Sequence, residues 1–318
     1  MRARATLLGL VVGLVAVGPA APDSAAQGQQ PPSPTSRAAG READEPRLRS
    51  ELRLAGMRFD NFFQAPDGAA QRDVDAAQGE LRFAWRMDER LTLRGGAIYT
   101  AYGDGLEGSP GLGLALRSEG ERHEWGAGVE WRDELPVFDL GEGFGGTAEV
   151  LRASGDYAFR LTRDWQVGAL GEWERQQIAG FAGRDNEATS VGAAVRYRGW
   201  GSAFSPEVGV ESGRRDATDA NEDFDQRDVW LRLRSAPTED LYLSFRVRQR
   251  DREYDVATPA ASNFGREDDR RDYTLSADYR FTEDLGLNLY ANFLEAGSTK
   301  PSREFESSMV LIGVTWGW

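Results

Sequence analysis

The chain ends on Met309-Val310-Leu311-Ile312-Gly313-Val314-Thr315-Trp316-Gly317-Trp318, a run in which apolar residues occupy every second position. Because side chains on a β-strand alternate with period two, one face carries Val310, Ile312, Val314, Trp316 and Trp318. The other face is mixed and small. One wholly apolar wall that ends in two indoles is typical of a strand that faces lipid and is anchored at a membrane interface.

The same alternation recurs from about residue 49 to the end of the chain. Residues 81–87 and 91–99 each carry an apolar row, and the polar segment 88–90 between them predicts a hairpin with one apolar face. Residues 273–281 and 285–293 repeat this pattern. Further apolar rows lie at 112–116, 125–131, 151–159, 165–173, 191–197, 204–210, 229–233 and 241–247. The pattern predicts about fourteen strands, within a range of about 12 to 16, and single-chain bacterial barrels have even numbers.

The first predicted strand departs from this alternation. Leu52 and Leu54 share one parity, whereas Met57 and Phe59 have the other. A β-bulge at Gly56 would restore all four to one face, and we expect one there.

The predicted connections alternate between tight and long. Tight turns are expected around Asp88, Gly120, Thr162, Gly199, Pro237 and Glu283, and long loops near 60–79, 103–111, 133–148, 176–188, 212–227, 251–271 and 295–307. A secreted antiparallel sandwich also alternates apolar and polar residues. Loops sorted by length onto two rims, with aromatic residues at both ends of the strands, favour a transmembrane barrel with short periplasmic turns and long extracellular loops.

The amino terminus predicts export. Arg2 and Arg4 precede an apolar run at 7–17, and small residues lead to a cleavage site before Gln27. We therefore expect a signal peptide over 1–26, a disordered periplasmic leader over 27–48, and one barrel domain over 49–318.

Composition narrows the class further. The apolar run at 7–17 is too short to span a bilayer as a helix. The chain has no cysteine, which excludes a lipoprotein anchor, disulfides, Cys-ligated metal centres and covalently attached haem. The net charge of −14 argues against a nucleic-acid surface. The mean hydropathy of −0.55 suits a barrel, because only every second strand residue meets lipid. No cofactor and no metal ligand are predicted.

The closing strand resembles that of Gram-negative outer-membrane β-barrel proteins, whose terminal aromatic residue is part of the signal read by the barrel-assembly machinery. The resemblance covers about the last ten residues. It implies an all-β, antiparallel, up-and-down transmembrane barrel located in the outer membrane. The implied partners are outer-membrane lipid, lipopolysaccharide and the assembly machinery, and a monomer is favoured.

Two sets of candidate residues follow from the alternation. The residues predicted to line a pore are Arg82, Arg94, Glu130, Glu172, Glu174, Glu207, Glu211, Arg232, Arg234, Arg246, Arg248, Arg250, Asp278 and Arg280. The aromatic residues predicted at the membrane interfaces are Trp85, Tyr99, Trp125, Trp131, Trp165, Trp173, Tyr273, Phe281, Trp316 and Trp318.

These charges suggest a channel for passive diffusion of small hydrophilic solutes or ions, like the monomeric general porins of about fourteen strands. A basic wall on the later strands would face an acidic wall on the middle ones. Alternatively, neighbouring Arg–Glu pairs brace the wall of a structural or partner-binding barrel whose lumen is largely closed. A hydrophobic-substrate transporter is the third possibility. It requires an ordered N-terminal plug and an apolar lumen pocket, and residues 27–48 are too polar for such a plug. The apolar loop at 133–148 either constricts the lumen or packs on the rim.

An enzyme is not expected. The single histidine, His123, follows a tight turn, and no serine or aspartate can be assigned to it. Glu172 and Glu174 form a carboxylate pair of the kind that hydrolyses glycans, but such pairs are also routine in a porin lumen.

Overall fold

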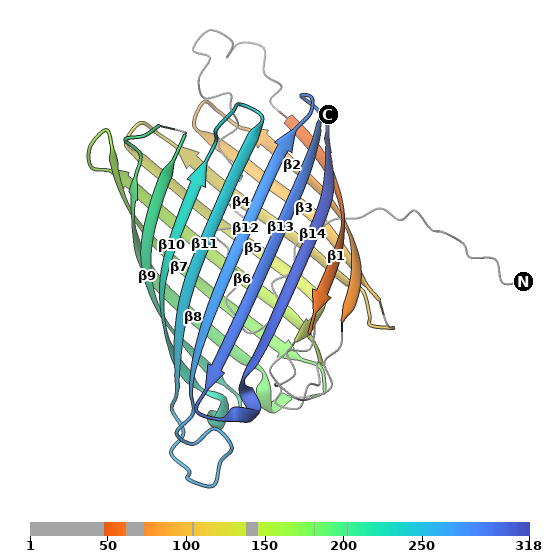
Figure 1. Cartoon of the computed structure of the whole chain (residues 1–318), viewed down its shortest axis with the longest axis vertical. Coiled ribbons are helices and arrows are strands. Elements are labelled where there is room, and N and C mark those ends of the chain that lie inside the picture. The colour runs from red at the N-terminus through yellow and green to blue at the C-terminus, as the bar shows by residue number, and fades with distance from the viewer. Residues whose placement is uncertain (1–47, 62–72, 104, 138–145, 181, 202) are drawn as a thin grey trace, which may run out of the picture.

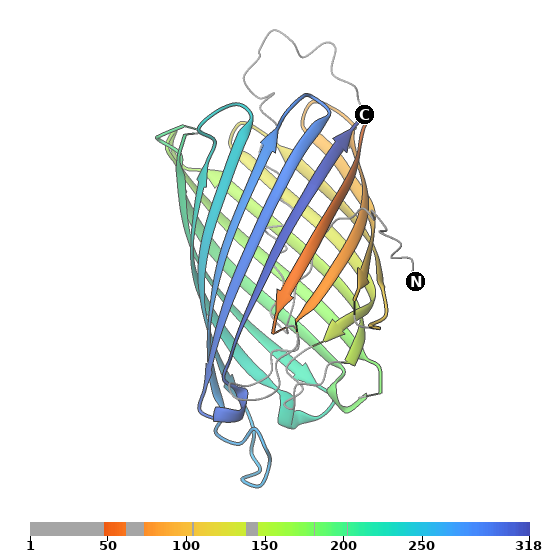
Figure 2. The ribbon, with the colours of Figure 1, turned by 45° about the vertical axis from the view of Figure 1, so that its right-hand side comes forward.

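The structure is a computed structural model that describes residues 48–61, 73–103, 105–137, 146–180, 182–201 and 203–318. It is a closed antiparallel barrel of fourteen strands in which each strand pairs with its neighbours in sequence, and β1 pairs with β14 (Figure 1). The predicted strand number and the up-and-down order are confirmed. Figure 2 shows β1 and β14 side by side, where the closing strand completes the barrel.

The strands have similar lengths, and their bounds are as follows. They are β1 (Leu48–Asp60), β2 (Val74–Arg86), β3 (Leu91–Tyr102), β4 (Ser109–Glu119), β5 (His123–Val137), β6 (Gly146–Arg160), β7 (Trp165–Ile178), β8 (Asn186–Tyr197), β9 (Ser205–Ala217), β10 (Phe224–Ser235), β11 (Leu241–Tyr254), β12 (Glu267–Arg280), β13 (Leu285–Ser298) and β14 (Phe305–Gly317).

The barrel has two distinct rims. The rim where the chain ends carries the short links, from three residues at 120–122 to seven at 198–204, and we call it the turn rim. The opposite rim carries links from six residues, as at 218–223, to thirteen at 61–73, and we call it the loop rim. In Figure 1 the C-terminus lies at the turn rim, and the 255–266 link extends beyond the barrel at the other end.

The links at the loop rim are shorter than predicted. The segment 212–227 was expected to be a loop, yet β9 continues to Ala217 and β10 begins at Phe224. The apolar alternation stops in these strand ends because both faces are polar, but the backbone ladder needs no apolar side chain to continue. Short 3₁₀-helices occur in three of these links, at η2 (Ala182–Arg184), η3 (Ala220–Glu222) and η4 (Pro301–Arg303). Within the described ranges, no helix has the length and apolar character needed to cross a membrane.

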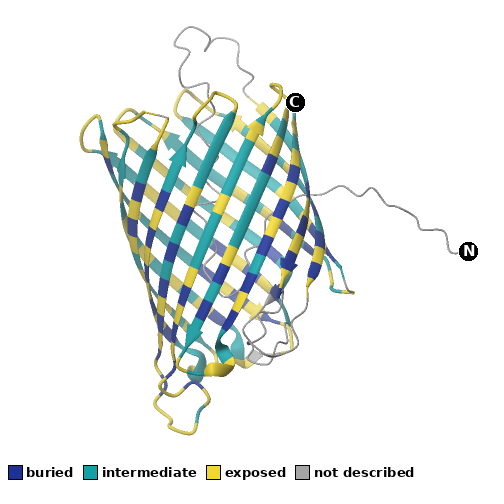
Figure 3. Ribbon diagram, in the orientation of Figure 1, coloured by how far each residue is buried: buried dark blue, intermediate teal, exposed yellow. Residues whose placement is uncertain are grey.

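The exterior of the barrel is apolar. Large hydrophobic side chains on the outer row are exposed, including Leu81, Leu112, Val191, Ile312 and Trp316. A water-soluble protein rarely exposes so large a contiguous apolar area, whereas a barrel in lipid requires one. Figure 3 shows the exposed and buried positions alternating along the strands.

The predicted bulge at Gly56 is wrong. β1 pairs with both neighbours in an unbroken register, so Leu52 and Leu54 lie on the exterior row while Met57 and Phe59 lie on the interior row. The expectation that every large apolar residue of a strand faces lipid caused the error. A register shift occurs instead in β5, between Arg132 and Leu135.

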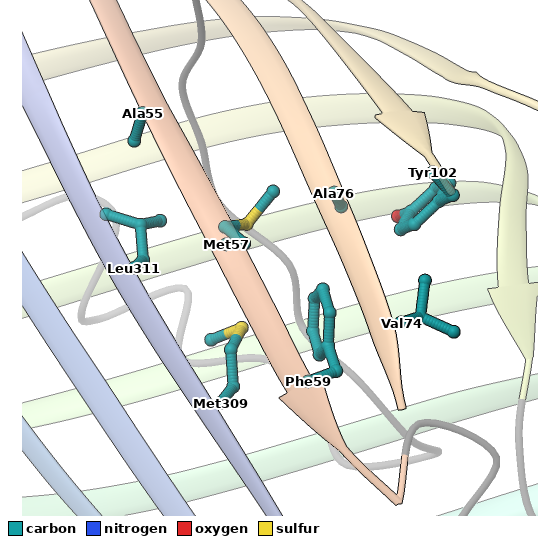
Figure 4. Packing of buried hydrophobic residues seen from close by; sticks show 8 residues of the cluster. All are labelled: Ala55, Met57, Phe59, Val74, Ala76, Tyr102, Met309 and Leu311. Carbon is teal, nitrogen blue, oxygen red and sulfur yellow. The ribbon is translucent and has the colours of Figure 1, made fainter. Parts of the chain in front are cut away.

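An apolar cluster fills part of the interior. Phe59, Met57 and Leu311 pack with neighbours from β2, β3 and β14 (Figure 4). The full set of buried residues is Ala55, Met57, Phe59, Val74, Ala76, Tyr102, Met309 and Leu311. All of them lie in the middle or in the loop-rim half of their strands, so the inner face of this part of the barrel wall is apolar.

Several predictions lie outside the described residues. These are the signal peptide, most of the leader, and the apolar residues Phe138, Leu140 and Phe144 of the 133–148 segment. The flanks of that segment are strand: Leu135 belongs to β5 and packs against the interior residues Ala148 and Val150.

Candidate functional site in the charged barrel interior

All fourteen residues predicted to line a pore lie on the interior row of their strands. Residues that face each other across neighbouring strands share one face of the sheet. Arg232, for example, is registered with Glu207 on one side and with Arg246 on the other. Their common face is opposite to that of the exposed Val229 and Leu231, which meet the exterior.

The ten predicted interface aromatics lie on the exterior, at two levels. Trp85, Trp125, Trp165, Phe281, Trp316 and Trp318 lie near the turn rim, and Tyr99, Trp131, Trp173 and Tyr273 lie nearer the loop rim. Trp125 and Trp131 are six residues apart, which is about 20 Å along a strand. Two aromatic levels that bracket an apolar band are the arrangement of a transmembrane barrel.

Asp228 on β10 is the centre of a buried ion cluster in the half of the interior nearer the loop rim. Its carboxylate accepts a hydrogen bond from Arg250 Nε at 3.1 Å and a further bond from Arg248. Neither Asp228 nor Arg250 has any exposed side-chain surface. Glu211 lies 3.6 Å from Arg248 and completes the cluster. Asp228 was not among the residues predicted to line a pore, although its place on the interior row, two residues before Trp230, follows from the alternation.

The predicted acidic wall carries its own arginines. Arg152 Nε lies 3.1 Å from Glu172, and the same guanidinium pairs with Glu174. Glu130 lies 2.8 Å from Arg132 and 3.9 Å from Arg152. Glu172 and Glu174 are therefore ion-paired to one guanidinium, which is not the arrangement of a free acid and base.

The expectation of a basic wall facing an acidic wall is also wrong for Glu207. This carboxylate lies on β9, two strands from β11 in the barrel order, and not across the lumen from it. It binds Arg196 at 2.8 Å and Arg234 at 2.9 Å. Neighbouring strands thus pair acids and bases along the wall, because interior residues of adjacent strands are only about 5 Å apart at their Cβ atoms.

Some of the charged interior side chains at the turn rim are partly exposed. Glu124 is shared by Arg160 at 3.5 Å and Arg198 at 3.2 Å, and the Arg198 side chain is 37% exposed. Arg280 pairs with Asp240 at 3.0 Å, and its side chain is 39% exposed.

Three more of the predicted residues lie in the half of the interior nearer the turn rim. Arg82 binds Glu80 at 2.6 Å, and Asp278 accepts from Asn288 at 2.6 Å. Arg94 is registered opposite Ala84 and Ala115. The exposed fractions of Arg198 and Arg280 indicate that solvent reaches charged side chains at the turn rim.

The 255–266 link contributes to the burial at the loop rim. Arg266 donates to the Asp268 carboxylate at 2.9 and 2.6 Å, and Asn263 donates to the backbone carbonyl of Asn221 at 2.8 Å. Both Arg266 and Asn263 are buried. In Figure 3 the buried positions concentrate toward this end of the barrel.

His123 shows no catalytic arrangement. It is the first residue of β5, on the exterior, and its Nδ1 lies 2.6 Å from the Tyr157 hydroxyl, with the Phe159 ring 5.1 Å away. It belongs to the aromatic level near the turn rim. Among the described residues, no group of His, Asp and Glu is arranged to hold a metal ion.

Comparisons with known proteins identify structures with a similar fold. No family model and no curated protein matches the chain. Among solved structures, the TodX monoaromatic hydrocarbon channel deltaS2 mutant superposes with a TM-score of 0.51 at 12% identity over 86% of this chain and 90% of that chain.

Two further structures match at lower TM-scores. Outer-membrane expressed OmpT of Vibrio cholerae gives 0.47 at 11% identity, over 85% of this chain and 97% of its own. The anion-selective porin from Comamonas acidovorans gives 0.44 at 10% identity, over 85% and 98%. The chain has the fold of outer-membrane β-barrel proteins.

Proposed function

We propose that this chain is an outer-membrane channel through which small hydrophilic solutes or ions diffuse passively. The observation that carries the proposal is the interior row, which bears charged and polar side chains on most strands while the exterior is apolar. Charged groups inside a barrel are stable only when they are hydrated or paired. Ion pairs occur in both halves of the interior, and some of the charges near the turn rim are partly exposed.

The size of the barrel supports small solutes only. Barrels of 8 strands are filled by side chains, and those of about 16 to 18 leave an aqueous channel, so fourteen strands enclose an intermediate space. The ion clusters of Asp228 and Arg152 occupy part of that space. A hydrated ion passing them would exchange water for these charges, so the clusters would act as the selective part of the channel.

The exterior supports insertion into the outer membrane. The two aromatic levels and the exposed apolar row between them match a lipid-facing band, and the predicted signal peptide supports export. The folded barrel should resist SDS until it is boiled, because closure leaves no strand edge to open. Identical migration with and without boiling, together with release as a soluble protein, would contradict this location.

We also propose lipid, lipopolysaccharide and the barrel-assembly machinery as partners, and a monomer as the working unit. Trp316 and Trp318 protrude from the exterior at the turn rim, at the free end of the closing strand. Deleting residues 316–318 should prevent insertion in cells, and wild-type levels of folded barrel after the deletion would remove the role of these residues.

Single-channel recording tests the function itself. Full-length chain refolded in detergent and added to a planar bilayer should give stable current steps whose size rises with KCl concentration. A sample boiled in SDS is the control, since it has the same composition and no barrel. Protein that inserts and gives no steady current would overturn the channel.

The burial of the Asp228 cluster favours a second candidate, a structural or partner-binding barrel with a largely closed charged lumen. Asp228 and Arg250 have no exposed side-chain surface, which is expected if ion pairs brace the wall and little water passes. The recording separates the two functions, because the closed barrel inserts without conducting.

The interior apolar cluster favours a third candidate, a transporter of hydrophobic compounds. Phe59, Met57 and Leu311 supply the apolar lining that such a transporter needs. Saturable quenching of an apolar fluorescent probe by the folded barrel, lost in Leu311→Asp, would support this function. Equal quenching in the variant would rule out this cluster as the binding site.

A further inference from the structure

Two arginines of the interior stand directly opposite each other on neighbouring strands. Arg232 of β10 and Arg246 of β11 are cross-strand partners, and they are only 4% and 5% exposed. Like charges in this position repel each other, and burial strengthens the repulsion because little water screens it. An anion held beside the pair would reduce this repulsion.

The indole of Trp230 lies within cation–π distance of both guanidinium groups. The Cζ atoms of Arg232 and Arg246 are each 5.2 Å from the Trp230 ring. The indole lies over Gly209 of β9, and a Cβ atom at that position would collide with the ring. The ring is therefore held in place, and it orients both cations through its π face.

Hydrogen-bond donors at this cluster remain unused. Nη2 of Arg232 and Nε1 of Trp230 are both buried without a hydrogen-bond partner among the described residues. Glu207, the interior acid registered with Arg232, already binds Arg196 and Arg234. Buried N–H groups are almost always hydrogen-bonded in folded proteins, so two unused donors on one row mark a place for an acceptor.

We propose that Trp230, Arg232 and Arg246 form a binding site for an oxyanion, meaning the carboxylate, phosphate or sulfate group of a small hydrophilic solute. The inference rests on the proposed channel for its physiological role and names its substrate class as anionic. Guanidinium groups and an indole N–H are donors only, so a ligand with several acceptor oxygens satisfies them. Its negative charge also offsets the repulsion between the two arginines.

The turn rim is the nearer opening of the barrel to this site. Arg232 is three residues from the end of β10 at that rim, and the intervening interior residue, Arg234, has a side chain that is 12% exposed. An anion that enters there first meets the partly exposed Arg198 and then the buried pair.

Calorimetric titration of the refolded full-length chain tests the site. Potassium phosphate, potassium sulfate and potassium acetate are titrated separately at low ionic strength, and at least one should bind saturably with one site per chain. Arg232→Gln should weaken that binding roughly 10- to 100-fold, the range expected when a charge-assisted hydrogen bond is lost. Trp230→Phe, which keeps the ring and removes the N–H, should weaken it roughly 2- to 10-fold.

Arg280→Gln is the matched control, since Arg280 is an interior arginine that already has Asp240 as its partner. It should leave the binding unchanged. An SDS gel with and without boiling shows which variants have folded, and Trp230→Phe decides the matter if Arg232→Gln does not fold. Absence of saturable binding by all three anions, or equal weakening in Arg280→Gln, would overturn the site.

The result is separable from the channel itself. Saturable binding in a barrel that carries no current would contradict the channel function and support the oxyanion site. Steady current without saturable anion binding would contradict the oxyanion site and support the channel function.

Discussion

Charged residues nearer the two rims of the barrel interior differ in how far their side chains are exposed. Near the loop rim, Asp228, Arg248 and Arg250 form a dry ion cluster. Near the turn rim, Arg198 and Arg280 form ion pairs whose guanidinium side chains are more than a third exposed. The contrast teaches that a charged interior row does not by itself mean an open lumen, because hydration and pairing stabilise the same residue types.

The difference has a structural origin. At the loop rim, the strand ends, the 255–266 link and the apolar clusters crowd the interior, and large side chains such as Phe59 and Arg266 are buried there. The links of the turn rim are short and place few residues over the opening. Water therefore reaches the interior charges more easily from the turn rim.

The largest effect is expected from removing the shared acid of the dry cluster. Asp228→Ala leaves Arg248 without its closest carboxylate and Arg250 buried beside it, so the free energy of unfolding should fall by about 3–5 kcal/mol. Urea unfolding of the barrel in lipid vesicles, followed by tryptophan fluorescence, measures the change.

Asp240→Ala is the matched deletion at the turn rim. It breaks the exposed pair with Arg280 and should cost no more than about 1 kcal/mol. Equal losses in the two variants would show that the halves do not differ in hydration.

The next effect concerns the apolar cluster near the loop rim. Leu311 is 1% exposed in the interior, and Leu311→Ala should lower the free energy of unfolding by about 2–5 kcal/mol because a cavity remains. Ile312→Ala on the exterior of the same strand should cost less, since lipid chains fill the space that the side chain leaves. The same unfolding assay compares them, and a larger loss for Ile312→Ala would invert the assignment of the two faces of β14.

A smaller effect is expected in the selectivity of the current. The double variant Arg160→Ser and Arg198→Ser removes two partly exposed charges around Glu124, so the reversal potential in a KCl gradient should shift toward cations. The shift should fade at molar salt, where the screening length falls to about 3 Å. Arg271→Ser on the exterior is the control, and a shift of the same size there would mean that the current does not pass Glu124.

The smallest effect lies in a single turn of the turn rim. The backbone N–H groups of Arg90 and Leu91 donate to the Asp88 carboxylate at 2.7 and 2.8 Å and hold the pKa of that carboxyl below its usual range. Because the folded pKa is the lower one, the carboxylate stabilises the turn above the unfolded pKa of about 3.9, and this contribution is lost as the pH falls through the folded value.

Asp88→Asn should therefore flatten the acid limb of the barrel's stability between about pH 4 and pH 2. The temperature at which the SDS-resistant band disappears, measured across this range, shows the effect. If the loss of stability at low pH is the same in Asp88→Asn, that loss is caused by other carboxyl groups.

Much of the architecture follows from the sequence. The alternation placed the fourteen predicted lumen residues and the ten aromatics on the correct rows, because side-chain direction in a strand depends only on parity. The strand that contains Met57 and Phe59 was predicted, but these two residues were expected to face lipid and instead face the interior. Parity alone does not say which of the two faces of a strand meets lipid. Their place inside became visible only through the register with Leu311 and Ala76.

The sequence by itself determined the closed barrel, its strand number and the face of most strand residues, because these depend on local periodicity and on the need to satisfy every backbone hydrogen bond. Only the tertiary structure decided which charges meet. Asp228 reaches Arg250, and Arg232 meets Arg246, because the stagger between β10 and β11 sets the level of each residue against its neighbour. That stagger arises when the sheet closes on itself, so ion pairs, dry clusters and unused donors become visible only in the folded barrel.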